Sequence, residues 1–194
     1  MKKIAMTMVA AALFGALHAV PPASASNHVV LIDEVFTGTA EHPDAQFIEI
    51  RLYAAGQGKF QGTSIDMWNA NGGSAGVFAT FQLNGTNSRV GDRFVACTPK
   101  AAALFKLPCD AIATGTLPAG GGKIKFRPAP DVVTYGTYTG TSNPQPTVSA
   151  STISPGRSAQ RVNASWSSAT GFTFGSFVDA APDPQTNLGL HGAL

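Results

Sequence analysis

Apolar and polar residues alternate along several short segments of the chain, and this pattern predicts β-strands. In residues 46–53, Ile48 and Ile50 fall on one face of a strand, whereas Glu49 and Arg51 fall on the other. Other segments are rich in β-branched and aromatic residues, which strands favour. The predicted strands are residues 29–36, 46–53, 63–68, 77–83, 93–98, 123–127, 131–138, 158–162 and 172–178.

One helical signal interrupts these strands. Pro99 starts the run PKAAALFK and Pro108 follows it, an arrangement typical of a short helix. With 21 Gly and 13 Pro in 194 residues, the composition excludes a helical bundle, and 44% apolar residues with only 12% charged residues exclude a disordered chain. The closely spaced strands predict an all-β sandwich or barrel with one short helix.

The first residues are predicted to lie outside the fold. Lys2 and Lys3 precede an apolar run, and Ala23-Ser24-Ala25 matches the cleavage site of a secretory signal peptide. We therefore expect residues 1–25 to be removed and the protein to be secreted, periplasmic or on the cell surface; the alternative is a retained membrane anchor. Residues 26–194 are expected to form one domain, with no further membrane span.

Residues 139–156 (TGTSNPQPTVSASTISPG) contain few large apolar side chains. They are predicted to form a long flexible surface loop, with a domain linker as the alternative. Residues 157–194 are too short and too poor in strands for a second domain, which favours the single-domain interpretation.

Signal cleavage also changes the charge. The chain has 13 Lys and Arg against 11 Asp and Glu, so loss of Lys2 and Lys3 leaves a neutral mature protein. Such a protein has no overall attraction to nucleic acid or anionic membranes. The local cluster of Lys123, Lys125 and Arg127 is interpreted as the solvated face of a strand rather than a nucleic-acid contact.

Cys97 and Cys109 are the two cysteines of the chain, and an exported protein favours a disulfide between them. Closing a loop of this size stabilises the fold by about 3 kcal/mol in the chain-entropy model. A redox or metal pair is the alternative, but the spacing fits neither a C-x-x-C motif nor a zinc site.

Two short segments partly match the pattern of a metal site or of a catalytic serine, but neither match holds in its sequence context. Glu41, His42 and Asp44 lie together, but their spacing matches no standard metal site, so a solvated loop is favoured. Residues 72–76 (GGSAG) match G-x-S-x-G, yet a strand-like run follows where a nucleophile elbow needs a helix. This segment is predicted to be a Gly-rich turn.

Acidic residues suggest two further possibilities. A small hydrolase would need two carboxylates to converge in a concave site; the acidic residues in question are Asp33, Glu34, Glu41, Asp44 and Glu49. Asp179 and Asp183, with Asn187, are weak candidates for calcium binding through oxygen ligands, although they form no EF-hand loop. The sequence predicts no cofactor and no established metal site.

Six short strings resemble, in order, motifs of the lamin-tail domain family. They are residues 29–36 (VVLIDEVF), 44–50 (DAQFIEI), 91–95 (GDRFV), 131–136 (DVVTYG), 156–161 (GRSAQR) and 182–187 (PDPQTN). The chain departs from the family at three places. Residues 51–55 (RLYAA) stand where the family has an N-P pair, and residues 65–68 (IDMW) match its Trp-x-Leu strand only loosely. Ala159 stands where the family's S-L-Q-R motif has leucine. The motif residues carried over are Glu34, Asp44, Glu49, Tyr135, Ser158, Arg161 and Asn187.

The resemblance implies an immunoglobulin-like β-sandwich that acts as an interaction module rather than an enzyme. Charged residues within strands need partners when they are half buried. We therefore expect Arg161 to pair with Glu49 or Glu34 and to join the late strand to the early ones.

Three functions follow from this reading. The leading one is an exported, non-catalytic module that binds a protein or a cell-envelope glycan through loops and strand edges. The others are the carboxylate-dependent hydrolase and a surface protein that assembles through exposed edges.

Overall fold

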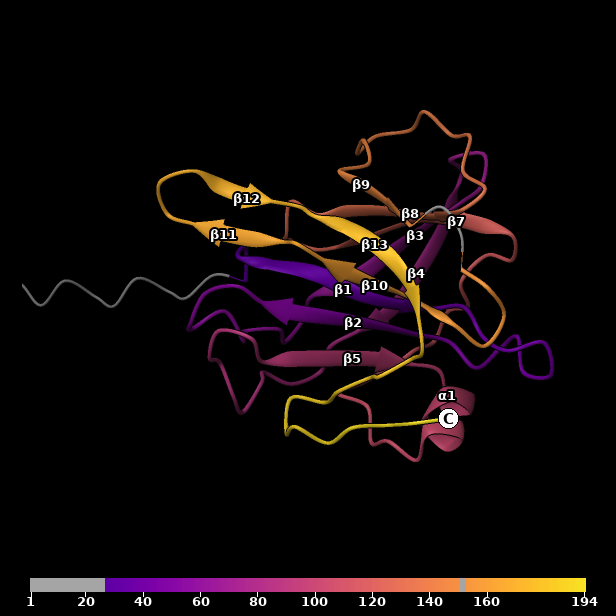
Figure 1. Ribbon diagram of the computed structural model, residues 1–194, viewed down its shortest axis with the longest axis horizontal. Coiled ribbons are helices and arrows are strands. Elements are labelled where there is room, and N and C mark those ends of the chain that lie inside the picture. Colours follow the sequence, from indigo (N-terminus) through magenta and orange to yellow (C-terminus); the bar gives the residue numbers. More distant parts are fainter. Residues whose placement is uncertain (1–26, 151–152) are drawn as a thin grey trace, which may run out of the picture.

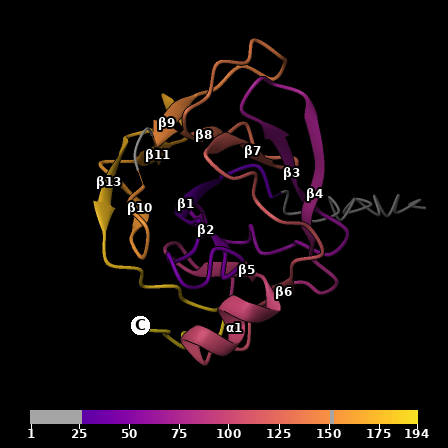
Figure 2. The same ribbon diagram turned by 90° about the vertical axis from the view of Figure 1, so that its right-hand side faces the viewer.

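The computed structural model describes residues 27–150 and 153–194, and two facing β-sheets dominate it (Figures 1 and 2). The first sheet contains, in spatial order, β13 (Ser176–Ala180), β10 (Ser158–Val162), β1 (Val30–Phe36), β2 (Phe47–Leu52), β5 (Arg93–Cys97) and β6 (Ala111–Ile112); the second contains β4 (Ser74–Thr80), β3 (Ser64–Asn69), β7 (Gly121–Phe126), β8 (Val132–Gly136) and β9 (Val148–Ala150). A separate hairpin joins β11 (Ser165–Ser167) to β12 (Gly171–Thr173). The predicted fold class, an all-β sandwich with one short helix, is confirmed. The predicted signal peptide lies outside the described residues.

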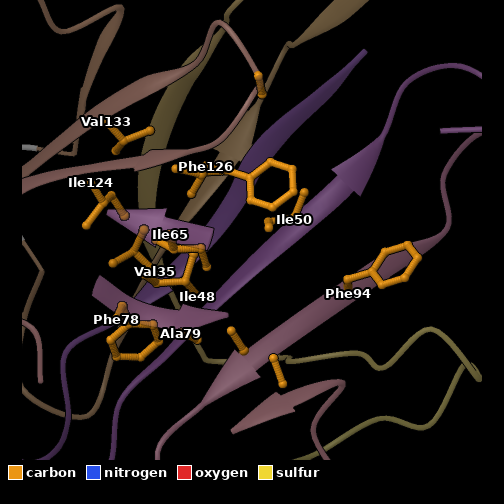
Figure 3. Packing of buried hydrophobic residues seen from close by; sticks show 14 of the residues in the cluster. Val35, Ile48, Ile50, Ile65, Phe78, Ala79, Phe94, Ile124, Phe126 and Val133 are labelled. Carbon is orange, nitrogen blue, oxygen red and sulfur yellow. The ribbon is translucent and has the colours of Figure 1, made fainter. Parts of the chain in front are cut away.

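The main core fills the space between the two sheets (Figure 3). Ile48 and Ile50 point into it from β2, as the alternating pattern predicts, and Phe94 enters from β5. The ring of Phe60 lies 4.1 Å from that of Phe94 and 4.8 Å from that of Phe126 on β7, measured between centroids. Apolar burial on this scale is the main term that stabilises a sandwich.

A second apolar cluster lies on the outer face of the first sheet, under helix α1 (Pro99–Phe105). Thr98 caps the helix, since its hydroxyl oxygen accepts the Ala101 N–H, and Lys106 ends it in the left-handed conformation at φ 51°. Cys97 and Cys109 form the predicted disulfide, which clamps the helix to β5. None of the helices in the described ranges has the length and apolarity needed to cross a membrane.

Several strands differ from the prediction because pairing partners are distant in the sequence. The strand expected at 77–83 begins earlier, at Ser74, because residues 74–80 pair with β3 across a tight hairpin; the G-x-S-x-G segment is therefore a turn followed by a strand. The strand expected at 172–178 is split into β12 and β13 near Gly175, whose φ of +66° interrupts an extended strand. The short strands β6, β9 and β11 were not predicted.

The segment predicted as a loop at about residues 139–156 contains one short strand. Val148–Ala150 forms β9, which pairs in parallel with β8, and residues 151–152 lie outside the described ranges. A three-residue strand carries too little hydrophobic periodicity to be recognised, and its partner is supplied by the tertiary fold.

The prediction of a solvated cationic face at 123–127 is wrong for Lys123. Its side chain is fully buried, and its ammonium donates hydrogen bonds to Ser142 O, Ser142 Oγ and Pro144 O at 2.6, 3.0 and 2.9 Å. The same ammonium lies 4.6 Å from the centroid of the Trp68 ring. Lys123 therefore fastens residues 142–144 over the outer face of the second sheet, whereas Arg127 is exposed.

The expected pairing of Arg161 with Glu34 or Glu49 is also wrong, because the guanidinium turns to the opposite sheet. Arg161 Nη2 lies 2.6 Å from Asp131 Oδ2, and both side chains are 0% exposed. At the same point Asp131 Oδ2 accepts the Ile32 N–H at 2.8 Å, and Arg161 Nε donates to Ile32 O at 2.6 Å. The ion pair thus joins β10 to the start of β8 and satisfies the backbone of β1, whose register against β2 shifts between Ile32 and Glu34.

Replacement of Arg161 tests this junction. We expect Arg161→Leu to lower the free energy of unfolding by about 3–5 kcal/mol, because it leaves Asp131 charged and unpaired in the interior. The matched control is Arg157→Leu, which removes an ion pair with Asp179 whose side chains are 45% and 37% exposed; a loss of at most about 1 kcal/mol is expected there. Equal losses in urea denaturation of the two variants would contradict the assignment.

Replacement of Lys123 tests whether its hydrogen bonds hold residues 142–144 in place. We expect Lys123→Met to accelerate backbone hydrogen exchange in residues 139–147, because the carbonyls of Ser142 and Pro144 lose their donor, while exchange within β7 stays slow. Lys125→Met, on the same strand but with a partly exposed side chain, is the control and should change neither region.

Candidate functional site

The C-terminal strap, residues 181–194, lies across the outer face of the first sheet and ends beside α1 (Figure 1). Three alternate backbone N–H groups of this strap donate to three carboxylates in turn. Asp183 N–H donates to Glu34 at 3.1 Å, Gln185 N–H to Glu49 at 2.6 Å, and Asn187 N–H to Asp110 at 2.9 Å. The carboxylates thus take the place of a neighbouring strand's carbonyl oxygens.

Arg93 provides a positive charge beside these carboxylates. Its guanidinium lies 3.2 Å from Asp33 Oδ2 and 2.8 Å from Glu49 Oε1, and it therefore holds two carboxylates at once. Burial raises the pKa of Asp33, Glu34 and Glu49, and the charge of Arg93 opposes that rise in each case.

The five carboxylates considered for hydrolysis therefore fall into two groups. Asp33, Glu34 and Glu49 lie together, but they are buried and engaged by Arg93 or the strap. Glu41 and Asp44 are exposed on the loop between β1 and β2. Within the described ranges, none of these acids lines either of the two hollows described below.

The other motif residues serve local structure. The Thr98 hydroxyl donates to Asp44 O at 2.7 Å, which ties the β1–β2 loop to the helix cap. Ser158 lies near enough to lower the pKa of Glu34, although its Oγ is outside hydrogen-bond geometry. Asn187 exchanges hydrogen bonds with Asn87: its Oδ1 accepts the Asn87 N–H at 2.8 Å and its Nδ2 donates to Asn87 O at 3.0 Å.

The weak calcium candidates are not brought together. Asp179 accepts a hydrogen bond from Ser154 Oγ at 3.0 Å and pairs with Arg157, whereas Asp183 lies 3.0 Å from His191 Nδ1. Across residues 27–150 and 153–194, no three His, Cys, Asp or Glu side chains are grouped so that they could hold a metal ion.

A hollow of about 340 Å³ opens at one end of the sandwich; we call it the end hollow. Its walls come from the β1–β2 loop, the segment before β7, the end of β8 and residues 153–155, and include Thr37, Thr39, Gln46 and Tyr135. Among the residues that the structure describes, no charged side chain lines it. Gln46 braces it, because its Oε1 accepts the Leu117 N–H at 2.7 Å.

A second hollow of about 300 Å³ lies beside Asp110, next to the exposed side chains of Leu83 and Leu188. Asp110 accepts the N–H groups of Val95 and Asn187, each at 2.9 Å, and so holds the strap to β5. Burial nevertheless raises the pKa of Asp110 from 3.8 to about 6.

Sequence analysis missed an aromatic cluster at the opposite end of the sandwich. Trp166 on β11 and Phe172 on β12 are directly opposed, Phe172 stacks on Phe174 with centroids 5.6 Å apart, and Tyr53 approaches the Phe172 ring edge-on at 6.2 Å. All four side chains are partly exposed. The available signal was a run of aromatic residues in 162–178 without one charged residue.

The titration of Asp110 predicts a specific pH dependence. Because its pKa is higher in the folded state, the folded protein keeps a proton that the unfolded chain loses between pH 3.8 and 6. The free energy of unfolding should therefore fall through this window, by on the order of 3 kcal/mol, and level off above it. Asp110→Asn lacks this term, so its stability relative to wild type should rise from pH 4 to pH 7 in urea titrations; a constant difference would contradict the assignment.

The chain matches no family model, no curated protein and no solved structure. Function is therefore inferred from the residues and geometry of the chain itself.

Proposed function

We propose that this protein is an exported, non-catalytic interaction module of the lamin-tail type that binds a protein or a cell-envelope component. One observation carries the proposal: the buried acidic groups hold the fold together, while the end hollow has no charged side chain among the described residues that line it.

The buried acids are poorly suited to acid–base catalysis. A general acid or base must reach a substrate proton within hydrogen-bond distance. Glu34 and Glu49 are 1% and 0% exposed, and the strap's own N–H groups occupy them. This supports binding over the alternative of a carboxylate-dependent hydrolase.

The end hollow is suited to an uncharged group. Its volume of about 340 Å³ falls in the range of small-ligand sites. Its lining combines apolar residues with the polar residues Thr37 and Thr39 and with the glycines Gly120 and Gly121. Recognition there would depend on shape and hydrogen bonds.

Export is supported by two independent features. The disulfide between Cys97 and Cys109 fits an oxidising compartment. The signal-peptide pattern of residues 1–25 leads to the same compartment and leaves a chain without net charge. A protein or glycan of the cell envelope is the class of partner that such a module would meet.

Filling the end hollow tests the proposal. Ala119 is exposed and lines the hollow, so Ala119→Trp should block it and reduce binding of the mature protein to isolated native cell envelopes by about tenfold or more. Ala55→Trp, exposed beyond the other end of β2, adds the same ring elsewhere and should bind as wild type does. Absence of envelope binding by the wild-type protein in a sedimentation assay would overturn the proposed function.

A further inference from the structure

We propose that the aromatic hairpin, residues 165–174 together with Tyr53, is a platform that binds the sugar rings of an uncharged glycan. This inference deepens the proposed function and rests on it, because it names one ligand class and a binding surface separate from the end hollow. Figure 1 shows the hairpin beside the start of β1, at the end of the sandwich opposite the β1–β2 loop.

The hairpin has little stability of its own. Its two strands have three residues each and, within the described residues, pair only with each other. An isolated two-stranded hairpin is marginally stable in water. The contact of Phe172 with Tyr53 and the hydrogen bond from Arg161 to Phe174 O hold it in place. The aromatic side chains of Trp166, Phe172 and Phe174 are nevertheless partly exposed, unlike the aromatic side chains of the core.

Trp166, Phe172 and Phe174 lie on the same face of the hairpin and are partly exposed. Phe172 and Phe174 are inclined by only 27°, and Trp166 lies opposite Phe172 on the neighbouring strand. A sugar ring presents a face of C–H groups, which carry partial positive charge, and the face of an aromatic ring is its negative side. A partly exposed aromatic face on the hairpin is therefore complementary to the flat face of a sugar ring.

Two polar atoms beside the platform lack partners. Arg51 Nε and Asp33 Oδ1 are buried and make no hydrogen bond within the described chain. The Arg51 guanidinium lies 5.5 Å from the centroid of the Tyr53 ring, and Tyr53 lies near enough to lower the pKa of Asp33. One atom is a donor and the other an acceptor, and a hydroxyl group serves both. Unpaired buried polar atoms are costly, so a ligand hydroxyl that reached them would recover part of that cost.

The charge of the hairpin favours a glycan over a nucleic acid. Residues 162–178 contain no charged residue, whereas nucleic-acid binding requires cationic groups that neutralise phosphates. The absence of charge in this segment fits a neutral ligand.

The chain contains two tryptophans, Trp68 and Trp166, which makes the test direct. In a Trp68→Phe background, Trp166 is the sole tryptophan, and its fluorescence should change on titration with at least one of three uncharged hexasaccharides: β-1,4-linked glucose, α-1,4-linked glucose and β-1,4-linked N-acetylglucosamine. In the wild-type background, Trp166→Ala and Phe172→Ala should weaken that binding about tenfold by calorimetry. Trp166→Phe keeps a ring and should retain most of the affinity. An unchanged denaturation midpoint shows that the variants are folded.

The outcomes separate this inference from the proposed function. If no hexasaccharide binds, or if binding survives both alanine variants, the glycan platform is wrong. If envelope binding is lost in Ala119→Trp but kept in Trp166→Ala, the interaction module stands without the platform. If Trp166→Ala abolishes binding of an envelope protein while no sugar binds, the hairpin recognises a polypeptide and the inference is overturned.

Discussion

The buried ion pair between Arg161 and Asp131 is the interaction on which the rest of the sandwich depends. It connects the two sheets at a place where the β1 ladder is interrupted, and it supplies the hydrogen bonds that Ile32 would otherwise lack. Asp131 also accepts a hydrogen bond from Thr147, next to β9, while Arg161 donates to the carbonyl oxygen of Phe174 at the end of the hairpin. Loss of either charge would leave the other buried and unpaired, which would strongly destabilise the fold. The ion pair therefore fixes the positions of the two sheets, β9 and the hairpin relative to one another.

The same principle governs the acidic residues on the outer face of the first sheet. Glu34, Glu49 and Asp110 accept the alternate N–H groups of the C-terminal strap, and Arg93 neutralises part of their charge. A protein with few charged residues thus uses several of them inside its structure. The two surfaces proposed for recognition, the end hollow and the aromatic hairpin, lie at opposite ends of the sandwich.

Much of the fold follows from local patterns. The alternation in β2, the start of α1 at Pro99, and the disulfide depend on residues close in sequence, and each was predicted. Predictions were wrong where the deciding partner is distant. Lys123 is charged and sits in an alternating strand, which predicts exposure, but residues 142–144 and Trp68 surround it. The aromatic cluster was missed because Tyr53 is 119 residues away from Phe172 along the chain.

The sequence by itself therefore determined the class of fold, the short helix and the disulfide, since hydrophobic period, caps and cysteine spacing act over a few residues. It also indicated that Glu34, Glu49 and Arg161 need partners. Only the tertiary structure decided which partners they have: Arg161 turns to Asp131, and the strap covers the acids. That choice depends on which strands become neighbours, and pairing across more than a hundred residues leaves no local trace in the chain.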